Sequence, residues 1–355
     1  MYLTTLRFRL KDSSSRNRLR KLGWACNDVW NYCNERTAYQ WAFGRTIFSA
    51  FDLHKLTAGV GKELGIHSQS VQAVCEEYAK CGKQFKRPTL NWRSRKRSLG
   101  WVPFKAVGVK VVGDGVTYGG QTFRFWASRP LPGKVRFGSF AEDGQGRWCV
   151  NLVCEDLTPP RIKTGKEAGV DLGLKTLATL SDGVAFTREN LTRTFELRLA
   201  TAQRARKKKQ VPRIHARIHA RIQNKRKDWN HKATTQLTNE YDVLAVGNVS
   251  SSKLKKTNMA KSVSDAGWAD FKTMLSYKAL RLGVTYLEVN ESFSTVTCSG
   301  CKGRTGPKGQ AGLGVRSGVC SGCGVSHERD VNAAQNILNS FRLGHQTLLK
   351  ESPCL

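Results

Sequence analysis

Long apolar runs are absent from this chain of 355 residues. A helix needs about 20 mostly apolar residues to span a bilayer, and no run approaches that length. The N-terminal stretch MYLTTLRFRLKDSSS also lacks the apolar core of a signal peptide, so we expect no secretion signal. It is more typical of a strand, with Leu3, Leu6 and Phe8 among polar neighbours. The sequence therefore argues against a membrane-spanning or secreted protein, and we expect a cytoplasmic one.

Acidic residues are scarce. The chain has 27 Asp and Glu against 59 Lys and Arg, a formal net charge of +32. Self-repulsion at this charge is costly unless a polyanion neutralises it. Nucleic acid is the favoured partner, because Lys and Arg contacts to phosphates release counterions. An anionic membrane surface is the weaker alternative.

Cysteine is plentiful, with 11 residues, and four of them form two CSGC motifs. Two CxxC pairs at this separation suit one tetrahedral zinc ion. The expected ligands are Cys298, Cys301, Cys320 and Cys323. Disulfides are the alternative, but cysteines within a CxxC motif rarely pair unless the motif is redox-active. Remaining cysteines, such as Cys26 and Cys33, continue an apolar helical spacing and are expected in a core, which favours a reducing environment.

Two of the few acidic residues stand in unusual places. Asp171 ends the short apolar strand expected over residues 168–171, where a carboxylate is costly unless it binds a cation. Asp330 follows the second CxxC motif and begins an expected helix. That helix would be lined by Val331, Ala333, Ala334, Ile337 and Leu338. Both aspartates are therefore candidate catalytic, metal-binding carboxylates.

The order of expected elements predicts a multidomain α+β protein. Residues 15 to about 82 are expected to be mainly helical, and residues 107–155 are expected to be short strands and turns that fit a small β-barrel. The N-terminal strand would belong to that barrel, so the helices would be inserted into it. After the Pro-rich linker, residues 161–292 give strand, hairpin, helix, strand, helix and strand, which is a three-layer α/β order.

Two basic segments are candidate nucleic-acid contacts. Between residues 83 and 105 basic residues alternate with aromatic ones, a composition typical of strand binding, and Trp92 and Arg93 are the candidates there. A solvated basic loop is the alternative. In the expected helices of residues 195–240, four basic residues recur at every fourth position and share one face. They are Arg213, Arg217, Arg221 and Lys225.

Beside this basic face, Ile214, Ile218 and Ile222 form an apolar stripe that we expect to be packed. His215 and His219 are also four residues apart and could form a metal pair. No carboxylate accompanies them in the manner of HExxH, so a phosphate-binding face over a packed stripe is the better interpretation.

Several motifs together resemble one family. GVDLGLKTLATLSDG, the strand before NVSSSKL, the TCSGC…CSGCG ribbon and HERDVNAAQNIL resemble TnpB, the RNA-guided nuclease of bacterial insertion sequences, which is similar to small type V CRISPR effectors. The resemblance covers essentially the whole chain and is most specific over residues 165–340.

The resemblance implies a domain order. A β-barrel wedge domain (1–14 and 96–160) would carry an inserted helical recognition lobe (15–95). A RuvC-like nuclease domain with an RNase H-like fold (161–292) would follow. A zinc ribbon that binds target nucleic acid (293–326), a final RuvC helix (327–345) and a tail (346–355) would complete the chain.

The resemblance also implies a chemistry. Such a protein is an RNA-guided DNA endonuclease, with a guide RNA and double-stranded target DNA carrying a short flanking motif as partners. Its expected metals are a structural Zn²⁺ and catalytic Mg²⁺ held by carboxylates, which match Asp171 and Asp330. We expect such a protein at the nucleoid of a bacterial cytoplasm.

One position departs from the family pattern. The usual glutamate before the NV motif is replaced by Gly247. Our first hypothesis takes the third carboxylate from Glu291, at the end of VTYLEVNE, as some family members relocate this glutamate; Glu288, on the opposite face, is the alternative. The second hypothesis is a nuclease-dead, RNA-guided DNA-binding repressor. A DNA-strand-transfer transposase is a third, which the RuvC-like order and the ribbon fit less well.

Overall fold

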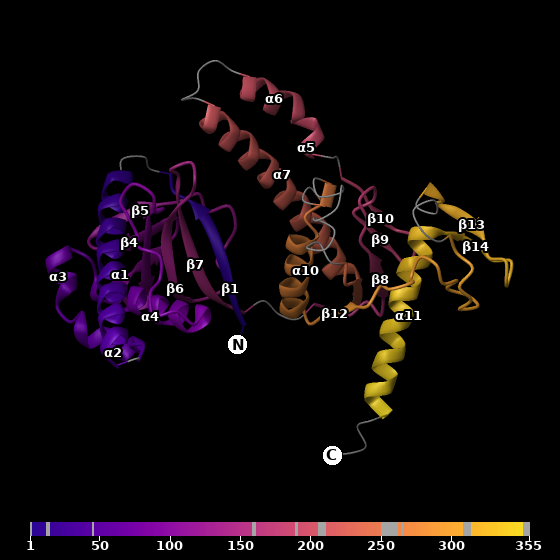
Figure 1. Cartoon of the computed structure of the whole chain (residues 1–355), viewed down its shortest axis with the longest axis horizontal. Helices are drawn as coiled ribbons and strands as arrows, with labels where there is room; N and C mark the ends of the chain where they lie inside the picture. The colour runs from indigo at the N-terminus through magenta and orange to yellow at the C-terminus, as the bar shows by residue number, and fades with distance from the viewer. Residues whose placement is uncertain are drawn as a thin grey trace. The chain divides into compact units, whose positions relative to one another are not determined.

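The computed structural model describes residues 2–11, 15–44, 46–157, 161–188, 191–204, 211–249, 262–263, 266–307 and 314–350. The chain divides into two compact units, Met1–Thr158 and Pro159–Leu355 (Figure 1). Each unit has its own sheet and core. None of the described helices is both long enough and apolar enough to cross a bilayer.

The first unit is built on a sheet that the N-terminal strand completes. Strand β1 (Tyr2–Arg9) pairs along its whole length with β7 (Trp148–Asp156), and the sheet order is β1-β7-β6-β2. The other two strands are β6 (Val135–Glu142) and β2 (Trp101–Lys105). A second sheet contains β3 (Lys110–Val112), β4 (Gly115–Tyr118) and β5 (Gln121–Arg124). One bridge, Leu10 to Phe125, links the sheets, and barrel closure remains a prediction.

Helices follow β1 before the next strand begins, as expected for an insertion. They are α1 (Arg16–Gly44), α2 (Ala50–Leu56), α3 (Val60–Leu64) and α4 (Ser68–Phe85), and a short 3₁₀ turn (Ala106–Gly108) follows β2. Cys26 and Cys33 of α1 are buried in the core of this unit, as the spacing predicted. The N-cap of α4 is His67, whose side chain accepts the Gln69 N–H.

The second unit has a five-stranded sheet of order β10-β9-β8-β11-β12. Strands β8 (Glu167–Asp171), β11 (Val243–Gly247) and β12 (Thr285–Val289) are parallel. Strands β9 (Ala178–Leu180) and β10 (Ala185–Phe186) form an antiparallel meander beside β8. The described helices are α5 (Leu191–Thr194), α6 (Glu196–Arg204), α7 (Val211–Glu240), α10 (Trp268–Leu282) and α11 (Arg329–Lys350). Strands β13 (Ser317–Val319) and β14 (Ser326–Glu328) form a ribbon before α11.

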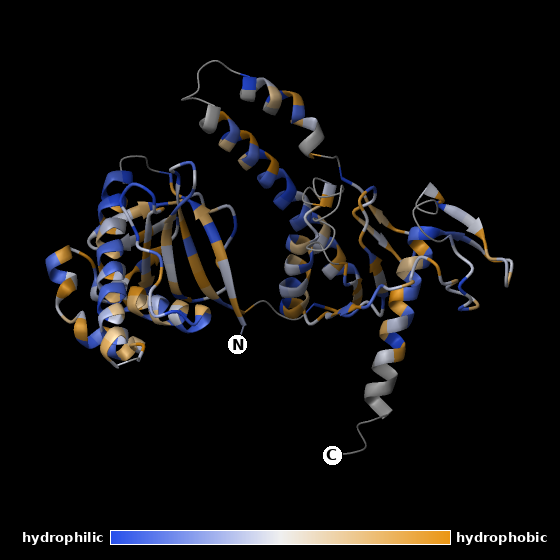
Figure 2. Ribbon diagram, in the orientation of Figure 1, coloured by the Kyte–Doolittle hydropathy of each residue, from blue (hydrophilic) through white to orange (hydrophobic). Residues whose placement is uncertain are grey.

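Strand alternation divides this sheet between two helical layers. Val170 and Val246 pack in one core with Phe271 of α10. Ala245 packs on the other face with Ile337 and other residues of α11. Because side chains alternate along a strand, Asp171 and Gly247 share the α11 face. The expected three-layer order is therefore present, and Figure 2 shows hydrophobic residues concentrated on these strands.

Gly169 allows α11 to lie directly on β8. A Cβ atom at this position would stand 2.0 Å from the Ala334 carbonyl oxygen and 2.9 Å from the Leu338 backbone nitrogen. Ala333 and Ala334 of α11 are fully buried at this contact. The helix also continues to Lys350, past the predicted end at residue 345, and the last five residues of the predicted tail lie outside the described residues.

Gly169→Ala is expected to lower the free energy of unfolding by about 1–3 kcal/mol, because the added methyl group pushes α11 away from β8. Urea titration followed by circular dichroism measures the change. Gly318→Ala is the control, since a Cβ there meets nothing within 4 Å. Equal stability of the two variants would contradict the close contact.

Candidate metal centres

The four cysteines of the CxxC motifs form one cluster. All four Sγ atoms lie within 4.8 Å of one another, and the sulfurs of Cys298 and Cys323 are 3.7 Å apart, as are those of Cys301 and Cys320. A disulfide has an S–S length of about 2.05 Å, whereas four sulfurs bound to zinc at about 2.3 Å stand about 3.8 Å apart. The cluster therefore fits a tetrahedral zinc site and does not fit disulfides.

Neighbouring groups favour the thiolate form, which binds zinc, at Cys298 and Cys320. The pKa of Cys298 is lowered to about 5, first because the Cys301 backbone N–H donates to its sulfur, and also because the His327 ring lies close by. His327 Nε2 is 3.0 Å from this sulfur. The pKa of Cys320 is also lowered, first by the Thr305 hydroxyl, 3.0 Å away. Our sequence analysis missed His327, although its position just after the second CxxC motif was a usable signal.

Asparagines of α11 hold the first CxxC motif on the helix. Asn332 Nδ2 donates to the Thr297 carbonyl at 2.8 Å, and its Oδ1 accepts the Ser299 N–H at 2.8 Å. Asn336 Nδ2 donates to the carbonyls of Ser294 and Thr297 at 2.9 and 2.6 Å. The NAAQN part of the sequence thus ties the cysteine cluster to the helix that carries Asp330.

The acidic residues meet at the carboxyl end of β8. The pKa of Asp171 is raised to about 7, first by burial and then by the negative charges of Asp330 and Glu291. Arg329 and Arg316 act in the opposite direction. The three carboxylates come from distant parts of the sequence. Asp330 and Glu291 lie near enough to Asp171 for their charges to shift its pKa.

Glu291 occupies the space that Gly247 leaves. A Cβ atom on Gly247 would stand 2.5 Å from Glu291 Oε2 and 3.4 Å from Glu291 Cβ. The Glu291 N–H donates to Asn248 Oδ1 at 3.4 Å. Burial raises the pKa of Glu291, and Lys272 acts against this rise. A carboxylate is thus present over the glycine, but it comes from the end of the neighbouring strand.

Glu288 lies on the other face of the sheet. It accepts hydrogen bonds from Lys272 Nζ at 2.7 Å and from the Tyr286 hydroxyl at 3.0 Å. Tyr286 packs against the core formed with α7 and α10, whereas Val289 packs against the α11 core. Glu288 is therefore separated from Asp171 by the sheet itself.

Asp330 is held by a cation of the protein. It lies in the first turn of α11, and Arg316 Nη1 donates to its two carboxylate oxygens at 3.1 and 3.0 Å. Within the part of the chain that the structure describes, only the cysteines form a metal-sized group of three or more ligands within 4.8 Å. Oxygen donors that repel one another suit Mg²⁺, so the carboxylates fit this ion chemically although Asp330 is paired with Arg316.

The predicted basic face of α7 is present. Arg217, Arg221 and Lys225 are exposed, and the last two lie over the Phe195 ring at 5.7 Å; the side chain of Arg213 lies outside the described residues. Ile222 is buried and Ile218 packs beside it, but Ile214 is exposed, so the apolar stripe is shorter than expected. The rings of His215 and His219 are 6.1 Å apart.

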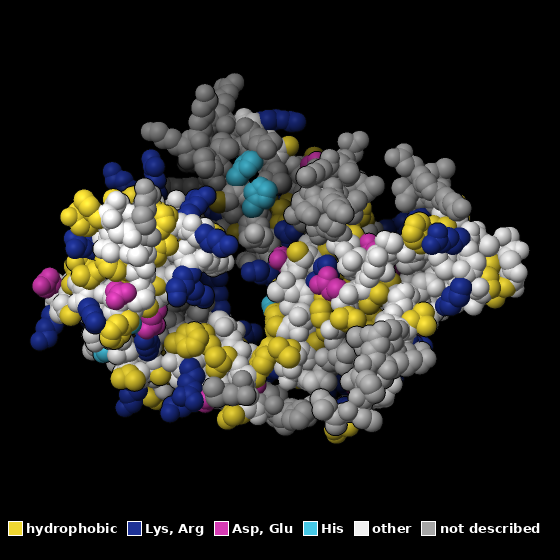
Figure 3. Space-filling view, turned by 60° about the horizontal axis from the view of Figure 1, so that its bottom comes forward, with side chains coloured by type: hydrophobic (Ala, Val, Ile, Leu, Met, Phe, Trp, Pro, Cys, Tyr) yellow, Lys and Arg dark blue, Asp and Glu magenta, His cyan; other side chains and the backbone are white. Residues whose placement is uncertain are grey.

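The two candidate nucleic-acid residues of the first unit differ. Trp92 is 61% exposed. Arg93 Nε donates to Asn27 Oδ1 at 2.6 Å, and its guanidinium lies 5.7 Å from the rings of Trp30 and Trp101. Arg93 is therefore engaged within the unit, and Trp92 is the available member of the pair. Figure 3 shows many other Lys and Arg side chains on the surface.

This geometry defines a class of protein. It is an α/β unit with acidic residues at one sheet edge and a four-cysteine cluster attached to it. The comparisons with known proteins are more specific. A model described as "Cas12f1-like, TNB domain" matches residues 268–337, and one described as "Probable transposase" matches residues 149–258. These matches, with the relatives described next, support a member of the TnpB family.

Curated relatives agree with this assignment. A Streptomyces pristinaespiralis protein whose name includes "RNA-guided DNA endonuclease" is 36% identical over 59% of this chain and 54% of its own length. A second one with these words in its name, InsQ of Escherichia coli (strain K12), is 28% identical over 63% and 60%. TnpB-like protein L79 of Acanthamoeba polyphaga mimivirus is 31% identical over 38% and 26%. The chain thus spans little more than half the length of the first two relatives.

Two solved structures also align. They are a Cas12f1–sgRNA–target DNA complex, over 96% of this chain and 99% of that chain, and a CRISPR–Cas12f ternary complex, over 92% and 82%. The identities are 15% and 12%, and the TM-scores are 0.40 and 0.41. Scores of this size do not by themselves establish a common fold.

Purified protein is expected to contain one zinc ion per chain, and Cys320→Ser is expected to lose it together with much of the stability of the second unit. Elemental analysis and thermal unfolding measure both effects. Cys81→Ser is the control, because this thiol lies outside the cluster. Zinc retained by Cys320→Ser, or absent from the parent, would contradict the site.

In zinc-containing buffer without Mg²⁺, the second unit is expected to lose stability between about pH 4 and pH 7. The folded protein holds the Asp171 proton more tightly than the unfolded chain, so this contribution is lost as pH rises through about 7. Asp171→Asn should remove this loss, which is at most about 4 kcal/mol. Urea titrations of both proteins across this range measure the difference. If the stability of the parent and of Asp171→Asn changed with pH in the same way, the raised pKa of Asp171 would be contradicted.

Proposed function

We propose that the chain acts as an RNA-guided DNA endonuclease whose carboxylates are Asp171, Glu291 and Asp330. The observation that carries this proposal is the carboxylate of Glu291 over Gly247, on the sheet face that also holds Asp171. A site that had lost its role would gain from losing one of these mutually repelling groups. Here a third carboxylate is instead built into the space left by the glycine.

The second unit is proposed to be a RuvC-like domain with an RNase H-like fold. Its support is the strand arrangement, in which the meander β8-β9-β10 is followed by β11 and β12, both parallel to β8. The acidic residues come from the ends of β8 and β12 and the first turn of α11. Carboxylates from three elements can thus face one strand of nucleic acid.

Each acidic residue has a distinct proposed role. Asp171 is held at the sheet edge by burial, and Glu291 is placed by the end of β12 and by Asn248. Asp330 joins them when its ion pair with Arg316 opens. Two Mg²⁺ ions bound by such carboxylates would supply an activated water and stabilise the leaving oxygen.

The partners follow from charge and from the names of relatives. Proteins named as RNA-guided DNA endonucleases match this chain, and the net charge of +32 requires a polyanion. We assign the exposed basic residues of α7 and Trp92 to nucleic-acid contacts. The first unit, as wedge and recognition lobe, would read the flanking motif, and guide pairing would read the sequence. The cysteine cluster would be a ribbon that positions the strand.

A nuclease-dead RNA-guided DNA-binding repressor is the second candidate. The ion pair of Asp330 with Arg316 favours it, because this pairing neutralises the Asp330 carboxylate without a metal ion. In that case the acidic residues would be a remnant, and the basic surfaces would be the working part of the protein.

Plasmid cleavage by the purified ribonucleoprotein in Mg²⁺ distinguishes these candidates. Glu291→Gln is expected to lower the cleavage rate at least about 100-fold and to leave target binding unchanged, because only a metal ligand is removed. Glu288→Gln is the matched control, since this residue lies on the α10 face, and it should cut like the parent.

Cleavage by Glu291→Gln at the parental rate would overturn the assignment of the third carboxylate. A parent that binds its targets but never cuts, across many guides and flanking motifs, would favour the repressor.

A further inference from the structure

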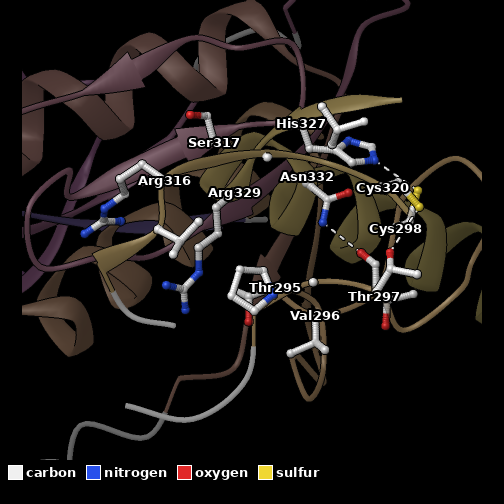
Figure 4. Close-up of a pocket in the computed structure, with 16 residues that line it drawn as sticks. Thr295, Val296, Thr297, Cys298, Arg316, Ser317, Cys320, His327, Arg329 and Asn332 are labelled. Carbon is white, nitrogen blue, oxygen red and sulfur yellow. Dashed lines mark hydrogen bonds between the residues drawn. The ribbon is translucent and has the colours of Figure 1, made fainter. Parts of the chain in front are cut away.

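A pocket of about 240 Å³ lies between the cysteine cluster and the start of α11. Figure 4 shows Cys298, Cys320 and His327 toward one end, with Arg316 and Arg329 toward the other. The arginine end adjoins the acidic site, because Arg316 bonds Asp330. The pocket therefore has a cationic end next to the proposed catalytic carboxylates.

The two arginines are fixed relative to each other by the backbone. The Arg329 N–H donates to the Arg316 carbonyl oxygen at 2.7 Å, which joins the start of β13 to the start of α11. Both residues line the pocket, and both positive charges act on Asp171. An arginine at the end of a hollow is suited to a phosphate group, which its guanidinium can bind through two parallel hydrogen bonds.

The partner that Arg316 has now is exchangeable. The Arg316 side chain is 46% exposed, and that of Asp330 is 22% exposed. An ion pair with this much solvent access is weak, so a competing phosphate can replace the carboxylate. Once Arg316 has moved to the phosphate, the Asp330 carboxylate can bind a cation.

We propose that this pocket is a phosphate subsite for the nucleic-acid strand, and that Arg316 exchanges Asp330 for a backbone phosphodiester of that strand. The inference rests on the proposed function only for the identity of the strand, which is the one to be cut. Arg316 is then a positioning residue with two alternative partners. Binding of the strand and binding of the divalent cation become coupled, because the first frees a ligand for the second.

The experiment uses zinc-loaded full-length protein, with Mn²⁺ as the cation probe and a 12-nucleotide oligo(dT) as the strand probe. Free Mn²⁺ is measured by electron paramagnetic resonance, and oligonucleotide binding by fluorescence anisotropy across a range of salt concentrations. The variant is Arg316→Gln. The matched control is Arg304→Gln, which removes the same charge from a residue that lies over the Phe293 ring, 4.2 Å away, and does not line the pocket.

Arg316→Gln is expected to change the two affinities in opposite directions. Without oligonucleotide, Mn²⁺ should bind about 2- to 5-fold more tightly than in the parent, because Asp330 has lost its competitor. With Mn²⁺ present, oligo(dT) should bind more weakly, and the slope of log affinity against log salt should fall by about 0.7. In the parent, oligo(dT) should tighten Mn²⁺ binding, and this coupling should vanish in the variant. Arg304→Gln should keep it.

Three results would overturn the inference. Weaker binding of both probes would indicate only damage to the fold. Tighter Mn²⁺ binding with unchanged oligonucleotide binding would mean that Arg316 only pairs with Asp330 and does not bind the strand. Inorganic phosphate that tightens Mn²⁺ binding as strongly as oligo(dT) does would identify a free-anion site. These measurements involve no cleavage, so a protein that never cuts can still show the coupling, and a nuclease can still lack it.

Discussion

Helix α11 rests on β8 without a side chain between them, and the functional part of the second unit is built around this contact. Gly169 and the buried Ala333 and Ala334 make the approach possible. The contact sets the start of the helix beside the end of the strand, so Asp330 and Asp171 come to one place although 158 residues separate them in the sequence. A bulkier residue at position 169 would disturb the acidic site and the cysteine cluster together.

The same helix organises the cysteine cluster. Asn332 and Asn336 bond the backbone between Ser294 and Ser299, just where the first CxxC motif begins. The zinc site is thus attached to the element that carries Asp330. Arg316, which lies between the two cysteine pairs in sequence, returns to contact that carboxylate. A metal ion at the cysteines would therefore also steady the helix that carries Asp330.

The position of Glu291 shows how a parallel sheet tolerates a missing side chain. Gly247 pairs in register with Val289 on the adjacent strand, and Glu291 comes two residues later. Its carboxylate reaches back over the glycine, to within 2.5 Å of where a Cβ would stand. A larger side chain on β11 would need that space, so Gly247 and the observed position of Glu291 depend on each other.

Local patterns in the sequence predicted what depends on local spacing. The CxxC spacing predicted the cysteine cluster, and strand alternation separated Glu291 from Glu288. Contacts between distant residues were beyond such patterns. Arg316 gave no signal in the sequence as the partner of Asp330, and Arg93 is engaged by Asn27 and two tryptophans rather than available to a phosphate. Both contacts depend on how segments that are distant in the sequence pack together. The periodicity of a single sequence does not show this packing.

The pairing of β1 with β7 has a consequence for synthesis on the ribosome. Tyr2 pairs with Asp156, so β1 finds its neighbour only when the chain as far as β7 has left the ribosome. Until then its hydrogen-bonding edge is open, and contacts this remote in the chain form slowly. The helices α1 to α4 can form during that wait. The nascent chain is therefore expected to be helical first, and most prone to aggregation just before β7 appears.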